Sequence, residues 1–108
     1  MIKVSVMYPN GPDATFDEAY YRDQHMPMVQ KLMGGACKYF TVDGAIAGVP
    51  AANAPYIAMG HLYCESVAAF QAGFGPHTDV IMADIPNYTN QQPVIQMSEV
   101  LVPDQPPA

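Results

Sequence analysis

Tryptophan is absent from this 108-residue sequence, and cationic side chains are scarce. The four cations, Lys3, Arg22, Lys31 and Lys38, are scattered along the chain, and the formal net charge is −6. A protein that binds nucleic acid or an anionic membrane through its charge needs a basic patch. The sequence therefore predicts neither nucleic acid nor a membrane as a partner.

Cysteine is also scarce, with Cys37 and Cys64 as the two examples. The sequence has no cationic leader and no long apolar stretch, so we expect neither an export signal nor a spanning helix. A domain of this size without an export signal is typical of the reducing cytoplasm. We therefore expect a cytoplasmic protein with free thiols.

The length and composition predict one compact domain. Half of the residues are hydrophobic and 13% are charged, which supports a buried core. A chain of 108 residues is too short for a second independent core. We assign residues 1–102 to the domain and the proline-rich residues 103–108 to a flexible tail.

Alternation of apolar and polar residues predicts strands over residues 2–8, 39–42, 56–63 and 94–102. Residues 44–55 are rich in glycine and proline and predict a long loop. Ser66 is placed to cap a short helix that ends near Gly75, and a second short helix is predicted over 78–84. A long helix, predicted over residues 16–33, follows the first strand. The order of elements is therefore β-α-β-β-α-β. This predicts an α+β, ferredoxin-like fold with a four-stranded antiparallel sheet.

The long helix is predicted over residues 16–33. Thr15 with Glu18 three residues later forms a capping-box pattern. Pro27 lacks an N–H and crowds the preceding turn, so the helix should kink or restart near His25.

Two helical segments can cover only one face of such a sheet. In the last strand Ile95, Met97 and Leu101 alternate with Val94 and Val100, so both faces carry apolar residues. The uncovered face needs a partner. We therefore expect two sheets to pack face to face as a homodimeric α/β barrel.

His25 is the strongest candidate for chemistry. Tyr21, His25, Met28 and Leu32 fall on one stripe of the long helix, which directs the imidazole into an apolar cavity against the sheet, with His77 or Tyr88 reaching the same space. This position suits a general acid or base. The alternative is a core histidine bonded to the carbonyl that Pro27 leaves free.

The other two histidines are weaker candidates. His61 shares a strand face with Met59 and Tyr63, whereas Cys64 points to the opposite face, which excludes a His61–Cys64 metal pair. His77 follows Gly75-Pro76 and could do no more than end a turn. No histidine pair has a zinc spacing, so no metal is expected.

The sequence contains no phosphate loop, nucleophile elbow, or flavin or nicotinamide fingerprint, so any activity should need no cofactor. Eight methionines and seven tyrosines suit an adaptable apolar cavity for a small hydrophobic organic ligand, although an ordinary core explains them too. Asp84, Asn87, Tyr88 and Thr89 add polar groups after the last helix, where a capped turn is the alternative.

Six segments carry a resemblance to a known family: 2–10, 16–27, 60–63, 70–72, 74–77 and 81–89. They are similar to the EthD family, whose name comes from an association with degradation of ethyl tert-butyl ether alongside a cytochrome P450 system. The resemblance covers about residues 2–102 and implies a dimeric α/β barrel. Relatives in that superfamily include muconolactone isomerases, cofactor-free monooxygenases and fungal dehydratases, so fold does not choose the reaction.

The resemblance carries over the positions of His25 before Met26-Pro27, of His77 after Gly75-Pro76, and of Asn87-Tyr88. One interpretation is a cofactor-independent oxidoreductase, isomerase or lyase of xenobiotic catabolism. The other is a non-catalytic protein that binds a metabolite or supports a cytochrome P450 system. The expected catalytic residues are His25, His77 and Tyr88, and the expected ligand-binding residues are Tyr21, Met28, His61, Tyr63, Asp84 and Asn87.

Overall fold

The computed structural model describes residues 1–46 and 54–102. Most of the predicted 44–55 loop and the whole predicted 103–108 tail lie outside the described residues.

A four-stranded antiparallel sheet forms one layer, with strand order β2-β3-β1-β4. The first strand along the chain lies inside the sheet, where Val4 is opposite Leu62 on one side and Met97 on the other. The β-α-β-β-α-β order is confirmed, and with it the ferredoxin-like α+β fold. The strands are β1 (Ile2–Pro9), β2 (Tyr39–Gly44), β3 (Tyr56–Cys64) and β4 (Val94–Glu99).

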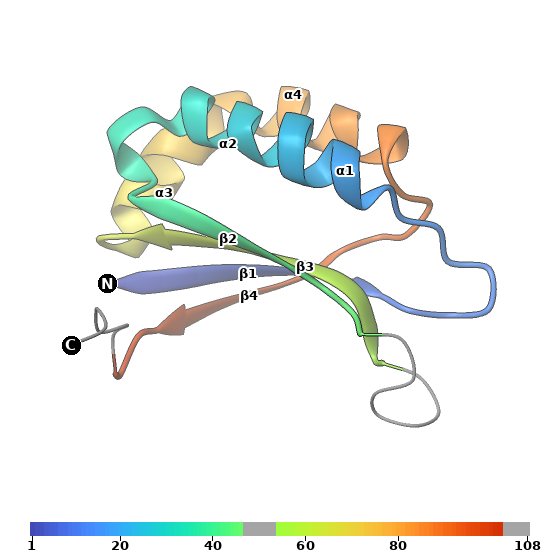
Figure 1. The fold of residues 1–108 in the computed structure, drawn as a ribbon. Coiled ribbons are helices and arrows are strands. Elements are labelled where there is room, and N and C mark those ends of the chain that lie inside the picture. The colour runs from blue at the N-terminus through green and yellow to red at the C-terminus, as the bar shows by residue number, and fades with distance from the viewer. Residues whose placement is uncertain (47–53, 103–108) are drawn as a thin grey trace.

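The helices form a second layer on one face of this sheet (Figure 1). Val4, Tyr8 and Leu62 from the sheet meet Tyr21 and Val29 from the first helix in the buried core. Full burial of each such side chain contributes roughly 1.5–3 kcal/mol. The helices are α1 (Glu18–Tyr20), α2 (Met26–Met33), α3 (Val67–Phe74) and α4 (Thr78–Asp84).

The predicted capping box at the start of the long helix is wrong. Asp17, not Thr15, is the N-cap, and its carboxylate accepts the backbone N–H of Tyr20. Thr15 is held instead by the segment before β4, because its N–H donates to the Asn90 side chain and its carbonyl accepts the Thr89 hydroxyl. This tie keeps the chain extended, so the helix begins two residues later than expected.

The break expected near Pro27 takes the form of a π-helical segment, Tyr21–His25, between α1 and α2. A π turn inserts one extra residue and rotates the following residues around the axis. The predicted stripe is therefore wrong after His25. Val29 and Met33 are buried, whereas Met28 and Leu32 are only half-buried against the core.

The later elements follow the sequence with one exception. Ser66 caps α3, as predicted, by accepting the N–H of Ala69. The last strand ends at Glu99 rather than residue 102, because its antiparallel neighbour β1 begins at Ile2, which pairs with Glu99. One further bond follows, from the Val100 N–H to the carbonyl of Met1.

The helix-free face of the sheet is more polar than the sequence suggested. Ser5, His61 and Asp43 form a hydrogen-bonded row across three strands there. Because strand residues alternate between faces, Ile95 and Met97 lie on the other face, beneath the helical layer, yet both remain exposed. The apolar surface of β4 therefore belongs mainly to the helix side.

Both cysteines are buried and unpaired. Burial raises the pKa of the Cys64 thiol to about 11, which disfavours a reactive thiolate. Within residues 1–46 and 54–102, the structure contains no helix with the length and apolar character needed to cross a membrane.

Candidate functional site

His25 lies at the end of the π-helical segment with its side chain directed at the sheet. It is 4% exposed, and its ring stacks on that of Tyr21 at a centroid distance of 5.5 Å. The backbone N–H of Met26, the first residue of α2, donates to the carbonyl of Tyr21, which closes the π turn around His25. The local distortion thus sets the imidazole between the helical layer and the sheet.

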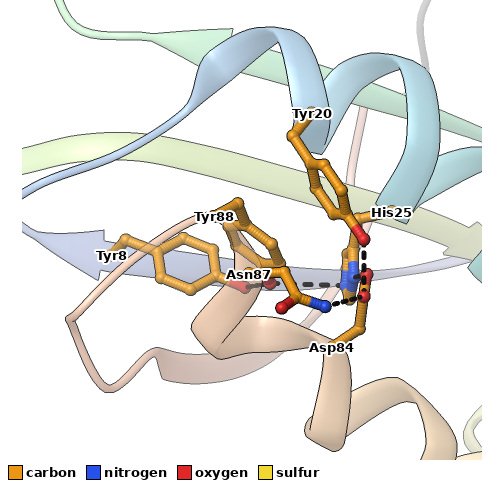
Figure 2. Close-up of polar contacts among 6 residues, drawn as sticks. All are labelled: Tyr8, Tyr20, His25, Asp84, Asn87 and Tyr88. Atoms are coloured by element: carbon orange, nitrogen blue, oxygen red, sulfur yellow. Dashed lines mark hydrogen bonds and ion pairs between the residues drawn. The ribbon is translucent and has the colours of Figure 1, made fainter.

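Asp84, at the end of α4, holds one side of the imidazole. Its carboxylate lies 2.9 Å from His25 Nδ1, and it accepts hydrogen bonds from the Tyr20 hydroxyl at 2.7 Å and the Asn87 amide at 2.9 Å. Figure 2 shows these three side chains converging on the carboxylate. Burial opposes ionisation of Asp84, but the three hydrogen bonds outweigh it and lower its pKa.

An ionised carboxylate only accepts hydrogen bonds, so His25 Nδ1 carries a proton and donates it to Asp84. In the neutral ring Nε2 then carries a lone pair that points to the Tyr88 hydroxyl, 3.3 Å away. The Tyr88 hydroxyl also lies 2.5 Å from that of Tyr8. Its single proton can go to either neighbour, and the long contact leaves Nε2 free to accept a different proton.

The pKa of His25 is lowered, because burial disfavours the charged ring more than hydrogen bonding and attraction from Asp84 favour it. His25 is therefore a neutral base at pH 7. Burial and the nearby Tyr8 hydroxyl raise the pKa of Tyr88. Tyr88 thus stays protonated and remains a hydrogen-bond donor.

Three aromatic rings pack around the ring of Tyr88. All pairs among Tyr8, Phe16, Tyr21 and Tyr88 have centroid distances between 4.9 and 5.7 Å. Gly60 makes room for this packing, since a side chain there would collide with the Tyr21 hydroxyl. The close packing of these rings therefore holds the Tyr88 side chain in place.

A small, mostly apolar cavity of about 40 Å³ adjoins His25. Its walls come from the helical layer and from the covered face of the sheet. The cavity lies where one was predicted, beside His25, but neither His77 nor Tyr88, one of which was expected to reach it, is among its lining residues. The lining residues are Val6, Tyr8, Tyr21, His25, Met26, Val29, Leu62, Phe74, Ile81, Met82, Ile85, Pro93 and Ile95.

The structure brings together five of the predicted site residues: Tyr21, His25, Asp84, Asn87 and Tyr88. The other four lie apart from this cluster. Met28 is half-buried beside the core but does not line the cavity, because the π turn rotates it away. His77 ends the 3₁₀ turn Gly75–His77 and is likewise outside the cavity lining.

His61 and Tyr63 are the remaining two, and both lie on the helix-free face. His61 Nδ1 is 2.9 Å from Ser5 Oγ, and its Nε2 is 3.0 Å from Asp43. Tyr63 stacks on Tyr39 at 4.2 Å. The sheet therefore separates these side chains from His25.

Sequence reasoning missed two members of the site, Tyr8 and Tyr20. The alternation of β1 already places Tyr8 on the same face as Val4 and Val6, which was an available signal. No local signal identifies Tyr20, because its role depends on Asp84, which comes from a helix distant in the sequence.

Within residues 1–46 and 54–102, no cluster of three or more histidine, cysteine or acidic side chains could hold a metal ion. The chemistry available to the His25 site is that of its own groups. They are a neutral imidazole oriented by a carboxylate, a phenol donor, and an apolar cavity beside them.

Comparison with known proteins identifies the chain. The model of the EthD domain matches residues 11–92. The structure resembles that of an EthD-like protein from Ralstonia eutropha, with 47% sequence identity, a TM-score of 0.87, and coverage of 94% of this chain and 92% of that one.

Two more distant structures share the fold. An EthD family protein from Bacillus halodurans is 16% identical, with a TM-score of 0.71 over 94% of this chain and 99% of that one. HapK from Hahella chejuensis is 17% identical, with a TM-score of 0.63 over the full length of both chains. No curated protein matches the sequence.

The family model spans most of the chain, and a solved EthD-like protein shares nearly half of its residues. This protein belongs to the EthD family.

Proposed function

We propose that this protein binds a small hydrophobic molecule beside His25 and moves a proton on it without a cofactor. The observation that carries the proposal is the geometry of one imidazole. Its Nδ1 is held by an ionised carboxylate, and its Nε2 is paired only through a long contact with Tyr88. A neutral, oriented base next to an apolar cavity is the arrangement that proton abstraction requires.

In the proposed step, His25 Nε2 takes a proton from a carbon of the ligand, and the resulting imidazolium is stabilised by Asp84 at 2.9 Å. The electron pair left on the ligand moves toward an electronegative atom that receives a hydrogen bond from Tyr88. His25 then returns the proton at another position or to a leaving group. Such a proton transfer is shared by isomerases and dehydratases and can also begin oxygenase-like chemistry.

The EthD family supports the substrate class. The family name associates these proteins with degradation of ethyl tert-butyl ether. The ether itself has no carbon acid that an imidazole could deprotonate, so for the proton-transfer step we propose a similar small hydrophobic compound that carries a carbonyl group. The alternative is a non-catalytic accessory or metabolite-binding protein that supports a cytochrome P450 system. The observation in its favour is that the cavity is lined almost entirely by apolar groups.

Exchange of carbon-bound protons in D₂O separates the two functions. We expect the protein to catalyse deuterium incorporation into a small enolisable ketone such as cyclopentanone, measured by NMR. His25→Gln should lower this rate roughly hundredfold or more, as expected for a lost general base. His61→Gln, on the other face of the sheet, is the matched control and should retain the rate. Equal exchange rates for His25→Gln and the unaltered protein would refute the proton transfer and favour the non-catalytic binding function.

We further propose that the protein works in the cytoplasm as a two-fold homodimer. The polar groups of Ser5, His61 and Asp43 on the helix-free face are hydrogen-bonded within the chain, so a second copy could cover them without orphaning them. The Tyr39–Tyr63 stack adds apolar area beside them. Light scattering at micromolar concentration should give twice the mass of the chain, and a monomeric mass would refute this assembly.

A further inference from the structure

The walls of the His25 cavity are not equally buried. Most lining side chains lie in the core, but Met82 on α4 is 40% exposed and Ile95 on β4 is 51% exposed. These two residues come from the two elements that border the cavity on its outer side. The cavity therefore opens to solvent between α4 and β4.

The arrangement of the layers explains this opening. Ile95 pairs with Val6 in the sheet, and both line the cavity, so both face the helices. Val6 belongs to an inner strand and is partly buried, whereas Ile95 belongs to the edge strand and stays exposed. The helical layer thus covers the inner strands and leaves the edge strand open on the same face.

The chemistry of the opening selects among ligands. Ile85 and Pro93 join Met82 and Ile95 in the lining, so none of these four carries a charge. The ionised Asp84 lies directly behind His25, and the whole chain has a net charge of −6. An anionic ligand would lose its hydration and meet a negative charge, whereas an uncharged one would not.

We propose that the opening between α4 and β4 is the entrance to the His25 site, that it admits uncharged apolar molecules, and that Met82 and Ile95 set the width of those molecules. This inference rests on the proposed function, for which it names the ligand class and the residues that select it. As the structure stands, the cavity of about 40 Å³ is well below the roughly 150 Å³ in which benzene binds other proteins. The unbranched, flexible side chain of Met82 must therefore move aside to admit a ring.

Methionine methyl signals provide the test, because Met26 and Met82 line the cavity whereas Met7 and Met59 do not. The probe is toluene, titrated into protein labelled with ¹³C at its methionine methyl groups. We expect toluene to shift the Met26 signal saturably and to leave those of Met7 and Met59 in place. Benzoate, an anion of similar size, should leave the Met26 signal unchanged.

Two pairs of variants locate the entrance. Met82→Ala should tighten toluene binding about tenfold by widening the opening, while Met97→Ala, at a residue of similar exposure outside the lining, should not. Ile95→Trp should weaken binding about tenfold or more by closing it. Val94→Trp, on the opposite face of the same strand, should leave binding unchanged.

Each other outcome counts against the inference. The inference would be overturned if toluene did not shift the Met26 signal in either the unaltered protein or Met82→Ala. Equal effects of Ile95→Trp and Val94→Trp on toluene binding would also overturn it. Benzoate binding as tight as toluene binding would remove the selection for uncharged ligands. Binding is measured here without turnover, so failure of His25→Gln to slow proton exchange would refute the proposed reaction and leave this result standing.

Discussion

Two histidine–aspartate pairs of almost equal length lie on opposite faces of one sheet. His25 Nδ1 is 2.9 Å from Asp84, and His61 Nε2 is 3.0 Å from Asp43. The carboxylates differ: the side chain of Asp84 is 15% exposed and accepts two further hydrogen bonds, whereas that of Asp43 is 60% exposed. The distance alone therefore does not mark a site. Burial, the additional donors and the adjoining cavity distinguish the His25 pair.

Removal of each carboxylate should sharpen this comparison most. Asp84→Ala leaves the buried His25 imidazole and the half-buried Tyr20 side chain without their acceptor, so we expect a loss of about 2–4 kcal/mol in the free energy of unfolding. Asp43→Ala removes a carboxylate that is already 60% exposed, so it should cost less than about 1 kcal/mol. Urea denaturation measures both. Equal losses would show that the two pairs share one structural role.

The second prediction concerns pH. The pKa of His25 is lowered in the folded protein, so below its ordinary value of 6.5 the unfolded chain binds more protons than the folded one. This group's contribution to stability should be fully present above pH 6.5 and decline as the pH falls from 6.5 through the lowered folded pKa. His25→Gln should flatten the stability profile in that window, measured by thermal or urea unfolding at a series of pH values.

His61→Gln is the control for the pH prediction. It keeps His25 and its burial, so the decline below pH 6.5 should persist in this variant. A profile that stays unchanged in His25→Gln but flattens in His61→Gln would assign the pH dependence to the wrong face of the sheet and contradict the account of His25 given above.

The sequence was sufficient for the strands, the order of elements and the burial of His25, since alternation and caps are local signals. It failed where distant segments meet. The local pattern predicts Thr15 as a cap, because the bond that holds Thr15 instead comes from Asn90, far along the chain. A straight helix would direct Met28 toward the cavity, but the π turn rotates it away. The partnership of His25 with Asp84 depends on α4 packing beside the first helix, which no local pattern encodes.

The smallest expected effect comes from removing one hydrogen bond to the Asp84 carboxylate. Tyr20→Phe removes one of the donors to the carboxylate, at 2.7 Å, and leaves the other two. A carboxylate with fewer donors attracts the imidazolium more strongly, so the pKa of His25 should rise toward its ordinary value. Histidine ring signals followed by NMR across pH measure this shift directly.

Tyr39→Phe on the other face is the control, since the Tyr39 ring stacks on Tyr63 away from His25. It should leave the His25 titration unchanged, and the stability cost of Tyr20→Phe should be close to about 1 kcal/mol, as for one hydrogen bond. If the His25 pKa were the same in Tyr20→Phe as in the unaltered protein, Tyr20 would only pack against Tyr88. Asp84 would then be oriented by Asn87 and His25 alone.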